Sequence, residues 1–493
     1  MRRESNSSDA ASVVSFETTT TTMTTSPLIK EDTPADGKRR GAGRLRQKAR
    51  RVLADMGAPP TARQDAKDGK RTLNYADPGG LVDAMSKPTS IAIAAPRQPL
   101  TTVRSPVHAP PAGHVVVRVR WVASTPLDLH RADGGLLVPS YPSLTGSGGA
   151  AGVVVDVGDG DTKGLAVGDR ITSFAFHGGA ESNHQEYMTV PAYLVSRVPD
   201  GIPLRAAATV PVNLVTVFHA VVKDLGLALP WPRRAADADT EMTATTSPPP
   251  PPPHEKDNIL IWGASSSVGV FAVQVLRHWG YKRILAVASA RHHQYLAGLG
   301  ATACFDYTDG GVVDALWRYT QQRDDSDNND NNNNNNNGGG GGGRGGGRGG
   351  VPFILDCIGS LHGSLTPLTR VATRGSVVAV MLPVIIRDAS VTEAPEYEMD
   401  VARCLPGQWA DGVEVRGVRT HFYLSDPDFK ERLQPEIIPQ LLAQGIVQPN
   451  RQRVVEGATM LERAQKALDL LRDRAVSGER LVWRVSEEEG EEE

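Results

Sequence analysis

Short apolar runs alternate with longer helical patterns in the second half of the chain. The run 259–262 is followed by a small polar stretch, 263–269, and then by an apolar-rich segment that ends at Gly280. An apolar run of this length is typical of a buried parallel strand, and an apolar segment closed by glycine is typical of a helix. The pattern predicts a strand, a tight turn and a helix in succession.

This strand–turn–helix unit can bind a phosphate, because small residues let the backbone approach a pyrophosphate and the helix N-terminus offers free N–H groups. Two glycines in such a turn are often only a tight connection. Here the alternation of strands and helices continues, which favours the phosphate site. We expect the site to be formed by Gly263, Ala264, Ser265, Ser266, Ser267, Val268 and Gly269.

The alternation predicts a doubly wound parallel sheet. Further strands are expected at 284–289, 301–305, 353–356 and 376–380, with a helix at 312–322. The second strand begins about 20 residues after the turn, in the position where residues that bind a nucleotide ribose are expected.

The first half of the ordered chain has a different pattern, with short strands punctuated by glycine and proline. Strands are expected at 115–122, which alternates in polarity, and at 153–157 after a Gly-rich turn at 146–152. A turn at 164–171 enters another strand. Such a pattern favours a small β-rich barrel. A helix over 206–222, interrupted at Pro211, and a C-terminal helix at 460–474 with a strand at 480–485 complete the expected elements.

Several segments have compositions that cannot build a core. Residues 1–87 are polar and lack periodicity, so we predict a disordered tail. Its basic cluster, 38–51, is either a nuclear or nucleic-acid signal or a solvated segment. Low-complexity insertions are expected at 230–256 and 323–350, and an acidic tail at 487–493.

Composition narrows the function classes. The 493 residues include 53 Lys plus Arg and 56 Asp plus Glu, which gives no general signal for nucleic acid or membranes. No apolar run reaches the roughly 18 residues of a membrane span. The cysteines, Cys304, Cys357 and Cys404, are far apart, so a disulfide framework is not expected and a four-cysteine zinc site is impossible. We expect a cytoplasmic protein.

With both halves in view, the chain resembles the medium-chain dehydrogenase/reductases over roughly residues 88–486. It is most similar to the zinc-free branch of quinone oxidoreductases and enoyl reductases, and to fungal zinc-binding-oxidoreductase-like proteins. The matching motifs, in order, are TPLDLH at 125–130, GSGGAAG at 146–152, GDR at 168–170, the turn at 263–269 and SGERLVWRV at 477–485.

The resemblance implies an α/β protein in which a Rossmann domain is inserted into a GroES-like β-barrel domain. The barrel would comprise 88–214 and 421–486, and the Rossmann NADP-binding domain 215–420.

The chain departs from the zinc-dependent relatives at their ligand positions. Those relatives carry cysteine in the region of Ser124 and Thr125, and Gly-His-Glu where this chain has Gly146, Ser147 and Gly148. Catalytic zinc needs three protein ligands around an open position. We therefore expect no zinc. The spacing of His130, His177 and His184 does not require a metal, and these histidines are interpreted as exposed or structural.

The end of the second strand indicates NADPH as the cofactor. It offers Ser289 and Arg291 but no acid, and an arginine can hold a 2′-phosphate with forked hydrogen bonds. Tyr307 matches a family position near the adenosine phosphate. The alternative is that Arg291 only covers the following helix.

Near the nicotinamide, the resemblance points to Asn213 and Thr216 and to Cys357, Ile358 and Gly359. Helix capping or back-bonding is the alternative for Asn213 and Thr216. Cys357 is interpreted as a packed residue rather than a nucleophile. No general acid is assigned, because Tyr141 does not fall where enoyl reductases place their proton-donor tyrosine.

The resulting hypothesis is an NADPH-dependent, zinc-independent reductase of activated double bonds or quinones. The alternative is a non-catalytic NADPH-binding sensor or interaction protein of the same fold. A small-molecule substrate is expected, without nucleic acid or membrane, and a homodimer is left open.

Overall fold

The computed structural model describes residues 88–107, 109–231, 251–331 and 350–486. It also describes two short strands, β1 (Ala76–Asp77) and β2 (Gly80–Leu81), which pair in antiparallel fashion within the predicted tail. The chain divides into two units, residues 1–48 and 49–493, and every described residue belongs to the second. The acidic tail and most of the N-terminal tail and the two insertions lie outside the described residues, so their disorder stays a prediction.

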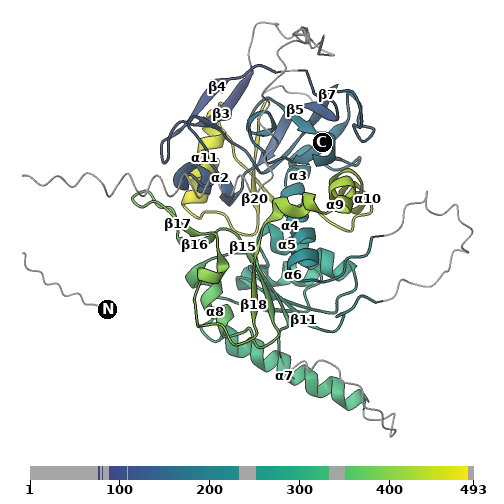
Figure 1. Ribbon diagram of the computed structural model, residues 1–493, viewed down its shortest axis with the longest axis vertical. Coiled ribbons are helices and arrows are strands. Elements are labelled where there is room, and N and C mark those ends of the chain that lie inside the picture. Colours follow the sequence, from purple (N-terminus) through teal and green to yellow (C-terminus); the bar gives the residue numbers. More distant parts are fainter. Residues whose placement is uncertain are drawn as a thin grey trace, which may run out of the picture. The chain divides into compact units, whose positions relative to one another are not determined.

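A six-stranded parallel sheet forms the core of the second half of the chain (Figure 1). In spatial order its strands are β13 (Ala303–Phe305), β12 (Arg283–Val287), β11 (Asn258–Trp262), β14 (Phe353–Asp356), β15 (Val377–Met381) and β18 (Glu414–Val418). The strand order reverses between β11 and β14, as in a doubly wound sheet. The predicted sheet is confirmed, with bounds within two residues for each predicted strand; β18 was not predicted.

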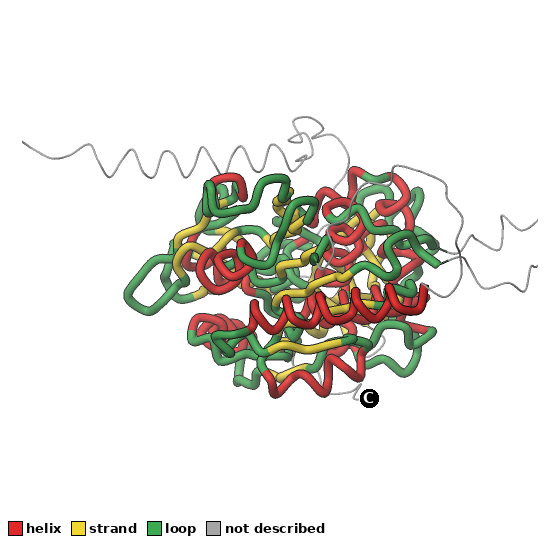
Figure 2. Tube along the Cα trace, turned by 90° about the horizontal axis from the view of Figure 1, so that it is seen from below, coloured by secondary structure: helices red, strands yellow, loops and turns green. Residues whose placement is uncertain are grey.

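Alternate residues of β11 enter two different cores, which explains why the whole run is apolar. Ile259 and Ile261 belong to the core that includes the helix after the turn, whereas Leu260 and Trp262 pack on the opposite face. Figure 2 shows helices on both sides of the strands. The helices of this part are α5 (Ser267–His278), α6 (His293–Leu299), α7 (Val312–Asn331) and α8 (Thr366–Thr369).

The barrel sheet is organised around β5 (His114–Ala123), which pairs with three strands. These are β7 (Gly149–Val157), β9 (Tyr187–Pro191) and β20 (Arg480–Arg484). The sheet also contains β8 (Arg170–Phe174), β10 (Val195–Arg197) and β19 (Gln452–Val454), and a separate three-stranded sheet contains β3 (Thr89–Ile93), β4 (Leu100–Arg104) and β6 (Ser143–Leu144). Strands from both sides of the parallel-sheet segment therefore build one barrel sheet, as the resemblance implies.

The Gly-rich stretch at 146–152 is not a turn throughout, and this prediction was wrong in part. Its last four residues are already in β7. A Cβ on Gly149 would lie 1.9 Å from the carbonyl oxygen of Ala208, and one on Gly152 would lie 2.1 Å from that of Arg118. These glycines let neighbouring backbone approach the strand closely.

Other helices differ from their predicted bounds. The 206–222 helix is split into α3 (Leu204–Ala207) and α4 (Pro211–His219), which confirms the interruption, and α4 begins at Pro211. α7 continues to Asn331, nine residues beyond the predicted end at 322 and into the predicted insertion. The prediction stopped where poor helix formers begin, but an established helix can propagate through them.

The remaining helical elements lie around the barrel sheet and between the strands. The α-helices are α2 (Pro126–Gly134), α9 (Pro427–Arg432), α10 (Ile438–Ala443) and α11 (Met460–Arg472). The short 3₁₀ or π turns are η1 (Gly179–Glu181), η2 (Ala192–Leu194), η3 (Ala220–Asp224), η5 (Ala290–His292), η6 (Leu361–Leu365), η7 (Val401–Arg403), η8 (Thr420–Ser425) and η9 (Leu433–Ile437). Between β15 and β18, strands β16 (Val384–Arg387) and β17 (Glu396–Glu398) form an antiparallel pair, and residues 384–398 are called the arm below.

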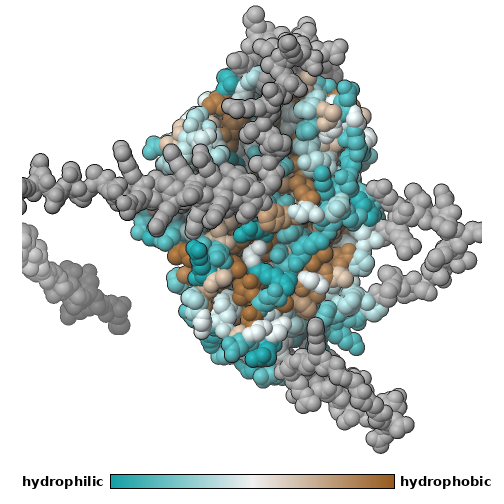
Figure 3. Space-filling model, in the orientation of Figure 1, coloured by the Kyte–Doolittle hydropathy of each residue, from teal (hydrophilic) through white to brown (hydrophobic). Residues whose placement is uncertain are grey.

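The face in Figure 3 shows apolar and polar residues interspersed, with apolar residues more frequent in the middle of the view. One helical stretch among the described residues, 204–224, is long and apolar enough to span a membrane. However, 83% of its apolar window is buried inside the fold, which a core helix also shows.

Candidate functional site

The predicted cofactor residues of the parallel sheet meet at one edge. The strands β11, β12, β13 and β14 end at Trp262, Val287, Phe305 and Asp356, and the predicted residues follow within a few positions of each end. Because the strands are parallel, their carboxyl ends share an edge, and the reversal of strand order beside β11 opens a crevice there. The predicted phosphate turn, the ribose site and residues 357–359 are thus neighbours.

The phosphate turn has the local geometry that its sequence predicts. Gly263 has a φ of +78°, which favours glycine, and the N–H groups of Gly263 and Ala264 donate to the carbonyl of Val287 at 3.0 and 2.9 Å. Ser266 caps α5, since its hydroxyl accepts from the N–H of Gly269 at 3.1 Å. The other N–H groups of the first turn have no partner within the helix, so they can hold an anion.

Asp356 organises the loop after β14. The side chain is fully buried; Oδ1 accepts from the N–H groups of Ile358 (2.9 Å) and Gly359 (3.2 Å), and Oδ2 accepts from the hydroxyl of Ser364 at 2.7 Å. Burial raises the pKa of Asp356 to about 6, against these hydrogen bonds. Gly359 has a φ of +64°, and a Cβ there would lie 2.2 Å from the carbonyl oxygen of Met381.

Cys357 follows this carboxyl group. Burial, together with Asp356, raises the pKa of its thiol far above the ordinary value, while a hydrogen bond with Ser266 acts in the opposite direction. A thiol with a raised pKa is a poor nucleophile. Cys357 is partly buried and packs against the larger core, which agrees with its interpretation as a packed residue.

The predicted 2′-phosphate site brings two of its three residues into contact. The hydroxyl of Ser289 lies 3.3 Å from that of Tyr307, whose residue is 52% exposed. Arg291 is exposed, and its Nε donates to His292 Nε2 at 3.3 Å. Asp306, which the sequence analysis did not single out, lies at the same edge. Its carboxylate accepts from the N–H of Ala290 at 3.2 Å and from the N–H and hydroxyl of Thr308 at 2.9 and 2.8 Å.

The two predicted residues on α4 behave differently. The hydroxyl of Thr216 donates back to the carbonyl of Val212 at 2.7 Å and lies 3.0 Å from the hydroxyl of Thr420 in η8. Back-bonding, the alternative considered for this position, is therefore present. Asn213 is buried, and its Nδ2 has no hydrogen-bond partner among the described residues. A buried amide donor without a partner is costly, and it fits a polar ligand group beside α4.

The three histidines considered as metal ligands have other partners. His130 Nδ1 lies 2.8 Å from the hydroxyl of Tyr397, His177 Nδ1 lies 2.8 Å from Glu181, and His184 Nδ1 lies 3.0 Å from the hydroxyl of Thr145. Over the described ranges, no group of three or more His, Cys, Asp or Glu side chains is placed to hold a metal ion.

The edge of the sheet fits a dinucleotide. The fit rests on the positive φ of Gly263, the capped N-terminus of α5 and the unpartnered Nδ2 of Asn213. A dinucleotide would place its pyrophosphate on the helix N-terminus and its ribose beside the end of the second strand.

Comparison with known proteins agrees with this architecture. Residues 111–200 match the model of the alcohol dehydrogenase GroES-like domain. The chain is 34% identical over 229 residues to the trans-enoyl reductase tazE of Aspergillus terreus, a match that covers 45% of this chain and 69% of that protein. The chain belongs to the trans-enoyl reductase family. This family lies within the medium-chain dehydrogenase/reductases, which the sequence motifs indicated.

Other members match over different spans. The trans-enoyl reductase himH of Aspergillus japonicus is 26% identical over 390 residues, covering 76% of this chain and 90% of that protein. For tndF of Aspergillus flavipes, the match spans 60% of the relative.

Solved structures show the shared fold. The enoyl reductase of CurK aligns with a TM-score of 0.57 at 16% identity, covering 81% of this chain and 99% of that chain. The Escherichia coli quinone oxidoreductase, solved in complex with NADPH, aligns with a TM-score of 0.56 at 17% identity, covering 80% and 99%.

Besides Asp306, three polar residues of the site region were not predicted from the sequence. Asp356 was interpreted only as the end of an apolar strand, although an acidic residue in an otherwise apolar run indicates a specific polar role. Thr420 and Tyr397 follow β15 by many residues, and neither falls in a recognised motif. Their partners, Thr216 and His130, are 204 and 267 positions away, so no local pattern could reveal the contacts.

Proposed function

We propose that this chain is an NADPH-dependent, zinc-independent enoyl reductase that saturates an activated carbon–carbon double bond. Membership of the trans-enoyl reductase family supports the reaction class. The observation that carries the proposal is the convergence of the phosphate turn, the ribose site and the loop after β14 at one edge of the parallel sheet.

NADPH, when bound, supplies the hydride. The N–H groups at the start of α5 would hold its pyrophosphate, and Ser289, Arg291 and Tyr307 its 2′-phosphate. Asn213 would donate its unused Nδ2–H to a polar group of the nicotinamide half. Ser147 stands where the zinc-dependent relatives have a ligand, and its buried hydroxyl has no partner among the described residues. A lone hydroxyl is no zinc ligand set.

The test of the reaction is oxidation of NADPH with a panel of enones, enoyl thioesters and quinones in the presence of a chelator. We expect turnover of at least one enone or enoyl thioester without added metal. Binding of NADPH without turnover of any panel member would instead support a non-catalytic sensor. Activity that disappears with the chelator and returns with zinc would contradict zinc independence.

The cofactor preference is tested with Arg291→Ala. A charge-assisted contact contributes about 1.5–3 kcal/mol, so the Kd for NADPH should rise about ten- to hundredfold while that for NADH stays nearly unchanged. Arg318→Ala, at an exposed position of α7, is the matched control and should change neither. Titrations at low and moderate salt separate the contact from general attraction. Equal weakening of both cofactors by Arg291→Ala would show that no 2′-phosphate is held there.

A further inference from the structure

The arm connects the candidate cofactor edge to the barrel part of the molecule. At its start, the N–H of Ile385 donates to the carbonyl of Gly359 at 2.7 Å, and Ile385 forms a parallel bridge with Ser360. Tyr397 is the cross-strand partner of Ile385 in the arm. Neighbouring strands lie about 5 Å apart, so Tyr397 is about two strand spacings from the loop after β14.

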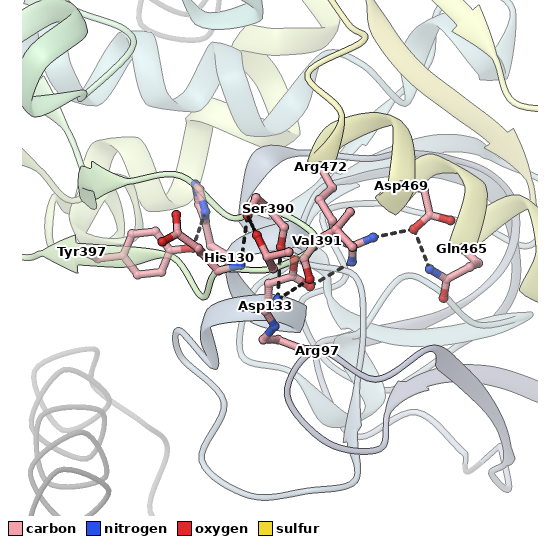
Figure 4. Close-up of polar contacts among 11 residues, drawn as sticks. Arg97, His130, Asp133, Ser390, Val391, Tyr397, Gln465, Asp469 and Arg472 are labelled. Carbon is pink, nitrogen blue, oxygen red and sulfur yellow. Dashed lines mark hydrogen bonds and ion pairs between the residues drawn. The ribbon is translucent and has the colours of Figure 1, made fainter. Parts of the chain in front are cut away.

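Tyr397 reaches from the arm to α2 (Figure 4). Its hydroxyl lies 2.8 Å from His130 Nδ1, and the two rings pack edge to face with centroids 4.9 Å apart. α2 accommodates the tyrosine through a glycine: a Cβ on Gly134 would lie 2.5 Å from Cε2 of Tyr397. His130 is buried, whereas Tyr397 keeps partial exposure.

Charged and polar contacts hold both sides of this pair in place. On α2, the carboxylate of Asp133 accepts two hydrogen bonds from Arg472 of α11, at 2.8 and 2.9 Å. On the arm, Nη2 of Arg97 donates to the carbonyls of Ser390 and Val391 at 3.2 and 2.7 Å. The hydroxyl of Tyr397 is therefore positioned by elements on two sides, about two strand spacings from the loop that follows β14.

The protonation states of His130 and Tyr397 suit a proton donor that is uncharged before the reaction. Burial lowers the pKa of His130 to about 4 despite Asp128 and Asp133, so the imidazole is neutral near pH 7. Burial, with Asp133 and Asp388, raises the pKa of the Tyr397 phenol above its ordinary value. The phenol thus stays protonated over the range in which enzymes work, while it remains a far stronger acid than the α-carbon of an ester or ketone.

We propose that Tyr397 is the proton donor of the reduction and that His130 is its positioning residue. The inference rests on the proposed function. When a hydride has been added to the β-carbon, the electron pair of the double bond moves onto the α-carbon and its carbonyl as an enolate. The O–H bond of Tyr397 then breaks as the α-carbon–hydrogen bond forms. The phenolate accepts a hydrogen bond from the Nδ1–H tautomer of His130 and takes a proton from water after the product leaves.

The experiment measures rate and stereochemistry together for the wild type, Tyr397→Phe and His130→Gln. The substrate is the best enone of the panel, and reduction is run in D₂O with unlabelled NADPH. NMR of the product then reports the configuration of deuterium at the α-carbon. Tyr141→Phe is the control; Tyr141 is half-buried and lies seven residues after the last residue of α2. Thermal unfolding and NADPH titration of each variant test its folding and its cofactor site.

Tyr397→Phe should lower kcat by about 10²–10⁴, the usual contribution of a general acid, with NADPH affinity unchanged. Deuterium at the α-carbon should be delivered with a single configuration by the wild type and randomly by Tyr397→Phe, because water then protonates the enolate. His130→Gln should lower kcat less and loosen the stereochemistry in part. Tyr141→Phe should match the wild type in rate and stereochemistry.

The outcomes separate this inference from the proposed function. A wild type that binds NADPH but turns over no enone or enoyl thioester removes the proposed function and this inference with it. An active wild type whose rate and α-configuration survive in Tyr397→Phe overturns the proton donor alone. If Tyr397→Phe fails to fold, His130→Gln provides the test. An unchanged kcat and a single α-configuration in His130→Gln would then contradict the proposed roles of Tyr397 and His130.

Discussion

Two buried carboxyl groups stabilise two different regions of the molecule, the cofactor edge and the contact between α2 and α11. The partners of Asp356 are two backbone N–H groups and the hydroxyl of Ser364, all within eight positions of it. The partner of Asp133 is the guanidinium of Arg472, 339 positions later in the chain. One region is completed by a single loop, whereas the other exists only when distant parts of the chain have met.

The difference also concerns charge. Asp356 has no cationic hydrogen-bond partner, so burial shifts its pKa upward to about 6. Asp133 has a side chain only 2% exposed and forms a two-bond ion pair. A buried acid with neutral partners can take up a proton, while a buried ion pair depends on both members. The two regions should therefore respond differently to mutation and to pH.

The largest effect is expected for Arg472→Met. Removing the guanidinium leaves the buried carboxylate of Asp133 without its partner, which should lower the free energy of unfolding by about 3–5 kcal/mol. Arg474→Met is the control, because its ion pair with Asp388 is exposed and worth about 0–1 kcal/mol. Urea unfolding near neutral pH measures both. Similar losses for the two variants would contradict the distinction between the regions.

A smaller, pH-dependent effect is expected for Asp356→Asn. The folded protein binds a proton at Asp356 more tightly than the unfolded chain, since the pKa rises from 3.8 to about 6. The stability that this group contributes is thus present at low pH and is lost as the pH rises from about 4 through 6. The variant lacks this slope, so its stability relative to the wild type should improve by about 2 kcal/mol between about pH 4 and pH 7.

Urea unfolding at a series of pH values tests this prediction, and the exposed Asp200→Asn is its control. The difference between wild type and Asp356→Asn isolates this carboxyl group from Asp224, whose pKa burial raises to about 7. Parallel stability curves for the wild type and Asp356→Asn would show that the loop after β14 holds no such group.

The smallest effect on stability is expected when two helix caps are compared. Ser266 accepts from the N–H of Gly269 at the start of α5, and Thr459 accepts from that of Glu462 at the start of α11. Replacing either by alanine should cost about 1 kcal/mol of stability without cofactor. Thermal unfolding with NADPH should then separate them, because only Ser266→Ala weakens the predicted phosphate site. If Thr459→Ala reduced the NADPH-induced stabilisation as much as Ser266→Ala, the result would contradict a special role of Ser266 at the phosphate site.

The cofactor edge could be predicted from the sequence because its determinants are local. The run 259–262, the turn at 263–269 and the strand ends specify a backbone geometry that needs only a few neighbouring residues. The same holds for Pro211, which restarts a helix through its own ring. Gly149 and Gly152 were misread, since their role depends on the close approach of the Ala208 and Arg118 backbone, which the neighbouring sequence does not indicate.

The contact between the arm and α2 could not be predicted in this way. His130 was interpreted as an exposed or structural residue, and its partner Tyr397 lies in β17, far away in the sequence. Only the register of the arm, with Ile385 beside Ser360 and opposite Tyr397, brings the two rings together. Long-range side-chain contacts of this kind depend on tertiary packing rather than on periodicity.

The pairing of β20 with β5 has a consequence for synthesis of the chain. Val482 lies opposite Ala123, so β5 has no β20 partner until residues 480–484, more than 350 positions later, have left the ribosome. The parallel strands β11 to β18 are closer together in sequence and can associate earlier. Non-local strand pairings are slow to form, and an unpaired strand edge can form hydrogen bonds with another chain. The nascent protein therefore has its longest exposure to aggregation in the barrel part, until residues 480–484 complete the sheet.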